Sequence, residues 1–257
     1  MQTAPLPANA ALPWIRESYA RVLREPARWL GMTLVYLAIA LVLKRVPFLG
    51  NFVLVLITPI MLAGALFAAR SPPAPAPAGA GAWLTALTRD AAQELFQVLR
   101  REEHTFAVVI VCILSLGLIV LVNIPELLIT GGSVVSGLTG ASLAGPLRLS
   151  LVLGIVVVIA LYVLLAMALL YVVPLTLFGN RQPVPAVAES FRACLDNRAA
   201  LAWFAAPFLA VNLAILVGFA FSRPLGYALL LVLGLVSLPA FVVALHASYR
   251  TLFESAR

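Results

Sequence analysis

The sequence predicts an all-α, polytopic membrane protein with six transmembrane helices, amphipathic interfacial helices and three parallel helix-plus-hairpin repeats. The first observation is composition, because 63% of the 257 residues are hydrophobic and only 11% are charged. A soluble domain carries about 25% charged residues, so apolar surface on this scale needs lipid to cover it. The second observation is a set of six charge-poor apolar windows. The third is an amphipathic segment before every second window.

The six apolar windows have the length of membrane spans. A bilayer core about 30 Å thick is crossed by about 20 helical residues at 1.5 Å each. A charge at mid-membrane costs about 2.5–3.5 kcal/mol, whereas each Leu or Val contributes about 0.3–0.6, so charge-free windows indicate spans. The windows are about 27–46, 48–69, 106–125, 149–173, 201–221 and 225–247. We expect Pro174 to kink or end the fourth.

The distribution of Lys and Arg predicts that both termini are cytoplasmic, because cytoplasmic connections are enriched in cations. The terminal side of a six-span topology holds thirteen cations: Arg16, Arg21, Arg24, Arg28, Arg70, Arg89, Arg100, Arg101, Arg181, Arg192, Arg198, Arg250 and Arg257. The opposite side holds four: Lys44, Arg45, Arg148 and Arg223.

Three connections on the terminal side have helical amphipathic patterns that suit the headgroup plane. Residues 13–26 carry the apolar stripe Ile15, Tyr19, Val22 and Pro26. Residues 83–101 carry Leu84, Leu87, Ala91, Leu95 and Val98, and residues 183–198 carry Val184, Val187, Ala188, Phe191, Cys194 and Leu195. Each segment feeds into a span, which predicts a unit of one interfacial helix and two spans, repeated three times.

Short sequence matches support the repeat. Glu17-Ser18-Tyr19 corresponds to Glu189-Ser190-Phe191, and Pro59 precedes Arg70 by the same spacing as Pro239 precedes Arg250. The middle unit matches only in outline. All three units start on the same side, so the repeat is parallel, unlike the inverted repeats of many transporters.

The chain is expected to form one integral membrane domain over 1–257. Residues 1–13 lack Lys and Arg and contain three prolines, which predicts a disordered N-terminus and a retained first span. Residues 71–82 (SPPAPAPAGAGA) form a Pro/Ala/Gly linker on the cytoplasmic side. Residues 126–147 form the long outside loop, either plainly flexible or a re-entrant helix with small residues at four-residue spacing.

Several short motifs resemble an uncharacterised family of proteobacterial six-span inner-membrane proteins. They are Trp14-Ile15-Arg16-Glu17, Pro47-Phe48-Leu49-Gly50, Thr58-Pro59, the stretch from Glu189 to Asn197, and Ser248-Tyr249-Arg250 with Phe253. The chain also looks, more distantly, like the membrane domain fused to some glycerophosphodiester phosphodiesterases. The resemblance implies the fold and an inner-membrane location. It implies no activity.

The sequence contains no pattern that carries enzyme chemistry, and we expect no enzymatic activity and no cofactor. No metal site is expected either, because Cys112 and Cys194 stand alone and no cluster of Cys and His occurs. Polar residues within or beside spans are candidates for a solute path by default. They are Asn123, Glu126, Asn212 and His246. Asn212, near mid-membrane, is expected to bond across to another helix.

The arginines at the terminal side are candidates for binding lipid headgroups. They are Arg16, Arg21, Arg24, Arg28, Arg192, Arg198 and Arg250. Because these cations flank apolar runs, the expected partner is membrane lipid, anionic phospholipid in particular, rather than nucleic acid. Protein partners stay unknown. Two functions remain open: a membrane-organising or partner-supporting protein, or a transporter or channel for a small or amphiphilic solute.

Overall fold

A computed structural model describes residues 6–46, 49–73, 77–130 and 149–254, and all regular elements in these ranges are helical. The long helices are α2 (Pro26–Leu43), α3 (Leu49–Arg70), α6 (Glu102–Thr130), α8 (Leu149–Leu169), α11 (Arg198–Phe221) and α12 (Arg223–Tyr249). The shorter helices include α1 (Ala11–Arg24), α4 (Ala80–Thr85), α5 (Ala91–Leu95), α9 (Val172–Phe178) and α10 (Pro183–Asp196). The described residues also form four short helical turns: η1 (Ala8–Ala10), η2 (Ala86–Asp90), η3 (Gln97–Arg100) and η4 (Arg250–Glu254).

Six helical segments are long and apolar enough to cross a membrane, as the sequence predicted. They are Pro26–Leu43, Leu49–Arg70, His104–Ile124, Val156–Phe178, Arg198–Phe221 and Arg223–Glu254. The share of the most apolar window that is buried within the protein ranges from 50% in Leu49–Arg70 to 17% in Arg198–Phe221. Such apolar surface is stable only in lipid, so the chain is a multi-pass membrane protein.

One boundary differs from the sequence prediction, and the predicted kink at Pro174 is confirmed. The third helix continues through position 125 to Thr130, so the expected outside loop begins later than 126. Its remaining positions, 131–147, lie outside the described residues. The fourth span breaks at Leu170 and Tyr171, before Pro174, because a proline cannot donate to the carbonyl four residues earlier and its ring displaces that carbonyl.

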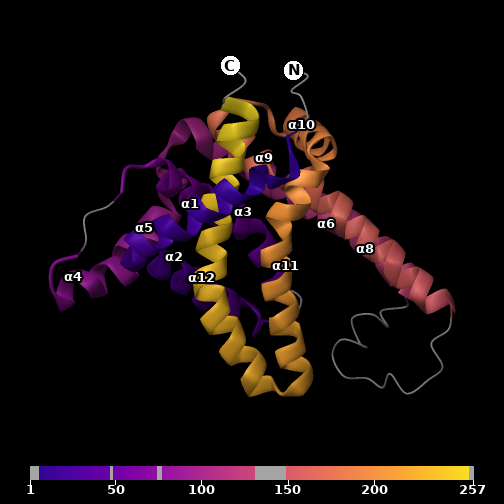
Figure 1. Cartoon of the computed structure of the whole chain (residues 1–257), viewed down its shortest axis with the longest axis horizontal. Coiled ribbons are helices and arrows are strands. Elements are labelled where there is room, and N and C mark those ends of the chain that lie inside the picture. Colours follow the sequence, from indigo (N-terminus) through magenta and orange to yellow (C-terminus); the bar gives the residue numbers. More distant parts are fainter. Residues whose placement is uncertain (1–5, 47–48, 74–76, 131–148, 255–257) are drawn as a thin grey trace.

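The spans form three hairpins, and each interfacial segment packs on the second span of the preceding unit. Helix α5 contacts α3, α10 contacts α8 and α9, and α1 contacts α12. Because α1 begins the first unit and α12 ends the third, this last contact closes the arrangement. Figure 1 shows both ends of the chain on the same side of the molecule, which we call the terminal face. The α11–α12 hairpin and the α6–α8 hairpin diverge from this face.

The first and third interfacial helices bury the same positions of the repeat. Helix α1 and the junction after it bury Ala11, Trp14, Ser18, Val22 and Glu25. Helix α10 and its junction bury Ala186, Ser190, Cys194 and Asn197, and also Pro183. These two sets correspond one to one, in the same order and with the same spacing. The shared burial pattern supports a repeated docking mode.

The buried stripe lies one position away from the apolar stripe that the sequence indicated. In α10, Val184 is 66% and Leu195 is 42% exposed, while Ser190 is fully buried. Small residues let the helix approach its neighbour closely, and the larger apolar residues face outward, where lipid can cover them. In the segment 83–101 the expected residues Ala91, Leu95 and Val98 are buried, although Leu84 is exposed and the segment is broken into short turns.

Aromatic side chains from the three second spans meet near the terminal face. The ring of Phe178, at the end of α9, contacts Phe67 of α3 and both His246 and Tyr249 of α12, with centroid separations of 5.5–5.9 Å. Two arginines cover this centre, since Arg70 lies over the Phe178 ring at 4.6 Å and Arg101 over Phe67 at 4.4 Å. The interior is therefore packed where the three units join.

Candidate functional site

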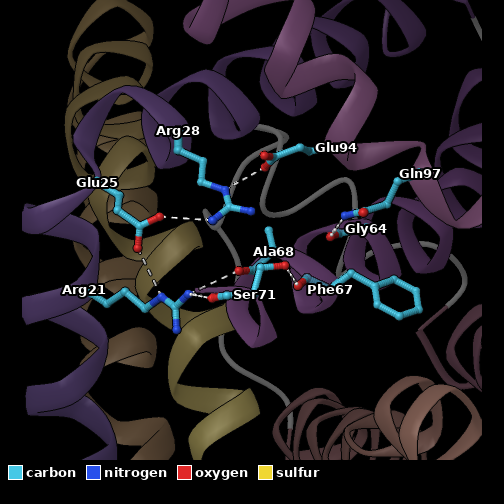
Figure 2. Close-up of polar contacts among 9 residues, drawn as sticks. All are labelled: Arg21, Glu25, Arg28, Gly64, Phe67, Ala68, Ser71, Glu94 and Gln97. Carbon is cyan, nitrogen blue, oxygen red and sulfur yellow. Dashed lines mark hydrogen bonds and ion pairs between the residues drawn. The ribbon is translucent and has the colours of Figure 1, made fainter. Parts of the chain in front are cut away.

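A buried ionic network ties the first two units together at the terminal face. Pro26 restricts the residue before it, so α1 ends and Glu25 adopts a non-helical backbone (φ −124°, ψ 53°). The Glu25 side chain is 2% exposed, and its carboxylate pairs with Arg21 at 3.3 Å and Arg28 at 3.0 Å. Arg28 also donates to Glu94 of α5 at 2.7 Å. Figure 2 shows the four side chains in one chain of contacts.

The same network caps the end of α3. The guanidinium of Arg21 donates to the backbone carbonyls of Ala68, at 3.3 Å, and Ser71. The last carbonyls of a helix have no partner within the helix, and a cation there also suits the helix dipole. Arg21 therefore stabilises the C-terminal end of the second span while holding Glu25.

Close backbone approach places α5 against α2 and α3. A Cβ at Gly64 would meet the carbonyls of Leu95 and Glu94, and a Cβ at Gly31 would meet Ala86 and Ala91. The Gly64 carbonyl also accepts a hydrogen bond from the Gln97 side chain at 3.0 Å (Figure 2). The two glycines allow the contact that brings Glu94 to Arg28.

The third unit docks through a hydroxyl. Ser190 of α10 donates to the Met167 carbonyl at 2.8 Å and accepts from the Tyr171 backbone N–H at 3.1 Å. The neighbouring Cys194 thiol also donates to Met167, at 3.5 Å. Burial raises the pKa of the Cys194 thiol to about 12, although its contact with Ser190 acts in the opposite direction. The thiol is therefore neutral and serves packing rather than chemistry.

The structure divides the seven headgroup candidates into two groups. The side chains of Arg16, Arg24, Arg192, Arg198 and Arg250 are exposed. Arg21 and Arg28 are mostly covered and bind Glu25, Glu94 and helix carbonyls. Partners inside the protein therefore hold these two guanidinium groups, and their predicted role at the headgroups stays a prediction. Glu25 is close to both arginines in the sequence, whereas Glu94 and Ala68 are distant from them and could not be recognised there as partners.

The three candidates for a polar path whose side chains the structure describes do not gather. Asn212 is exposed on α11 and donates to the Phe208 carbonyl of its own helix at 2.8 Å; among the described residues it makes no bond to another helix, contrary to the expectation. Asn123 donates to Ile119 and accepts from Tyr162 of α8 at 3.5 Å. His246 is buried against Phe178. The side chain of Glu126 lies outside the described residues.

The described residues contain no group of three or more His, Cys, Asp or Glu side chains that could hold a metal ion. Cys112 and Cys194 are both buried and unpaired with each other. The fold and these contacts define a helical multi-pass membrane protein whose units are locked together at one face. No family model, curated protein or solved structure matches the chain.

Proposed function

We propose that this chain is a non-enzymatic protein of the bacterial inner membrane that organises the bilayer by binding anionic phospholipid headgroups at its terminal face. The observation that carries the proposal is the set of exposed arginines on α1, α10, the start of α11 and the end of α12: Arg16, Arg24, Arg192, Arg198 and Arg250. Arginine binds phosphate through two parallel hydrogen bonds. Each cation near an anionic surface gains about 1 kcal/mol, and less beside an acid such as Glu17 or Asp196.

The terminal face is proposed to be cytoplasmic, since the six-span topology predicted from the sequence assigns thirteen of the seventeen cations to the side of the chain ends. Reporter fusions after Arg70, Arg181 and Arg257 should give a cytoplasmic signal. Fusions at Gly50, Gly137 and Arg223 should give a periplasmic signal. A cytoplasmic signal at Gly137 would overturn the six-span topology.

A membrane-organising role is better supported than transport. A transporter needs a polar route, and Asn212 and His246 would have to share a cavity. Asn212 instead faces outward, and His246 lies in the packed aromatic centre. The apolar outer residues of α1 and α10, such as Leu23 and Leu195, are placed to enter the headgroup boundary beside the arginines.

The test is mass spectrometry of lipids that co-purify with the protein. The wild type should be enriched in phosphatidylglycerol or cardiolipin relative to the membrane from which it is extracted. Replacing Arg192→Gln and Arg198→Gln together should remove most of this enrichment. The matched control replaces the exposed Lys44 and Arg45, at the opposite end of α2, with Gln. Bound lipid that mirrors the bulk membrane in all three proteins would show that the arginines only set topology.

A further inference from the structure

An apolar groove, open along one side, lies between the first and third units. Its walls are the helices α2, α3 and α12, with Leu95 of α5 at one end. The floor is buried and includes Trp29, Met32 and Met61, while rim residues such as Leu62 and Leu238 are partly exposed. The cavity has a volume of about 200 Å³. All of its lining except Leu95 belongs to membrane-spanning segments, so the groove opens toward lipid rather than water.

The size and chemistry of the groove select its occupant. Pockets for whole small-molecule ligands measure about 300–1,000 Å³, so this one fits a chain segment rather than a complete lipid. Three hydroxyl groups line it: that of Tyr36 and those of Thr33 and Thr58, which already donate within their own helices, Thr33 to Trp29 at 2.9 Å and Thr58 to Leu54 at 2.7 Å. A flexible hydrocarbon chain suits walls of this kind.

One polar group on the floor lacks a partner. The Trp29 side chain is 1% exposed, and its indole Nε1 has no hydrogen-bond acceptor among the described residues. A buried N–H without an acceptor is costly. Because less than 1 Å² of this atom is accessible, an acceptor brought by a ligand reaches it only when the side chains that line the groove shift. Trp29 is in the first turn of α2, near the headgroup level, where a lipid has its ester carbonyls.

We propose that the groove binds one acyl chain of a phospholipid, with the ester carbonyl accepting a hydrogen bond from Trp29. The local charges favour a neutral ester over the carboxylate of a free fatty acid. The residues beside Trp29 and Leu95 are Arg28 and Glu94, and they are paired with each other at 2.7 Å. A fatty acid would need a cation there, whereas an ester needs only the donor. This site is independent of the terminal-face arginines.

The first test measures whether acyl chains reach the buried Trp29. Two proteins, each retaining one tryptophan (Trp29 or Trp203) with the others replaced by Phe, are reconstituted in phosphatidylglycerol vesicles with brominated acyl chains. Trp203 is 60% exposed on α11 and reports ordinary lipid contact. Bromine should quench Trp29 to the same degree as Trp203. Quenching of Trp203 alone would overturn the proposal.

Filling the groove gives the matched variant. Ala65→Phe places a ring in the cavity and should abolish Trp29 quenching, with Trp203 quenching retained as proof of folding. Ala65→Leu is the milder alternative if Phe prevents folding, and should reduce the quenching. Unchanged Trp29 quenching in a folded filling variant would count against the groove.

The second test addresses the ester carbonyl. Protein is equilibrated with equal amounts of diester and diether phosphatidylglycerol, and retained lipid is measured by native mass spectrometry. The wild type should retain several-fold more diester lipid, and Trp29→Phe should retain both equally. Equal retention by the wild type, or displacement of phospholipid by added oleate, would overturn the proposal. Neither result depends on Arg192 or Arg198, so this hypothesis and the headgroup hypothesis can fail separately.

Discussion

The Ser190 hydroxyl accepts a hydrogen bond from the backbone N–H of Tyr171 at 3.1 Å, at the point where the fourth span is broken. In an unbroken helix this N–H would bind the carbonyl of Met167, and Ser190 donates to that same carbonyl at 2.8 Å. The serine therefore stands between the two groups that would otherwise pair. An interfacial helix thus completes the hydrogen bonding of a neighbouring span, which joins the second and third units.

Removing the Ser190 hydroxyl should destabilise the protein more than removing another buried serine hydroxyl does. Ser190→Ala leaves a buried N–H without an acceptor, which costs about 1–3 kcal/mol. The matched control is Ser18→Ala in α1, a serine that is equally buried and whose hydroxyl, among the described residues, bonds to the Ile15 carbonyl of its own helix alone. Thermal unfolding in detergent should show a clearly larger loss for Ser190→Ala. Equal losses would mean that the inserted hydroxyl has no special role.

The close packing of α5 on α3 should leave no room for a side chain at Gly64. Gly64→Ala places a methyl group against the Leu95 carbonyl, and overpacking of this kind costs about 1–3 kcal/mol. Gly234→Ala in α12 is the control, because no atom lies within 4 Å of the added carbon. A helical Gly→Ala change without a clash stabilises by about 0.5–1 kcal/mol. The two variants should therefore shift the melting temperature in opposite directions, and a rise for both would refute close packing at Gly64.

The buried network should depend on Glu25. Glu25→Ala removes the partner of two largely covered arginines, and breaking a buried pair typically costs about 3–5 kcal/mol. Glu25→Gln keeps hydrogen-bond acceptance and should lose less. The control, Glu189→Gln, affects an exposed pair with Arg181 at 3.3 Å, where about 0–1 kcal/mol is expected. Equal losses of unfolding free energy in Glu25→Ala, Glu25→Gln and the control Glu189→Gln would contradict the buried network.

The Cys194 thiol should resist alkylation in the folded protein. Its pKa of about 12 lies far above the ordinary value near 8.5, and only the thiolate reacts. At pH 8 its reaction with N-ethylmaleimide should be roughly a thousand-fold slower than that of an ordinary thiol, and the rate should rise with pH. An exposed comparison is Leu195→Cys with Cys194→Ala, both proteins carrying Cys112→Ala. Mass spectrometry of labelled membranes gives the rates, and similar rates for the two sites would show that Cys194 is accessible.

The linear sequence was sufficient to predict the spans and their grouping. Charge-free windows mark membrane helices because an unpaired charge in lipid costs more than several apolar residues return. The amphipathic segments 13–26 and 183–198 were recognisable because helical spacing is local. The Glu-Ser match in α1 and α10 was also visible, and it marks the serine that is fully buried in both helices.

Which face of each interfacial helix packs inward was decided only by tertiary structure. The helical spacing in α10 put Cys194 and Leu195 on one apolar stripe facing lipid, but close approach to α8 buries Ser190 and Cys194, while Leu195 stays exposed where lipid can cover it. The partners of Arg21 and Arg28 were also decided by tertiary structure. The spacing of the two arginines suggested a headgroup surface, but Glu94 and the end of α3 reach them across the fold. A membrane protein has two apolar environments, lipid and its own interior, and hydrophobicity along the chain does not distinguish them.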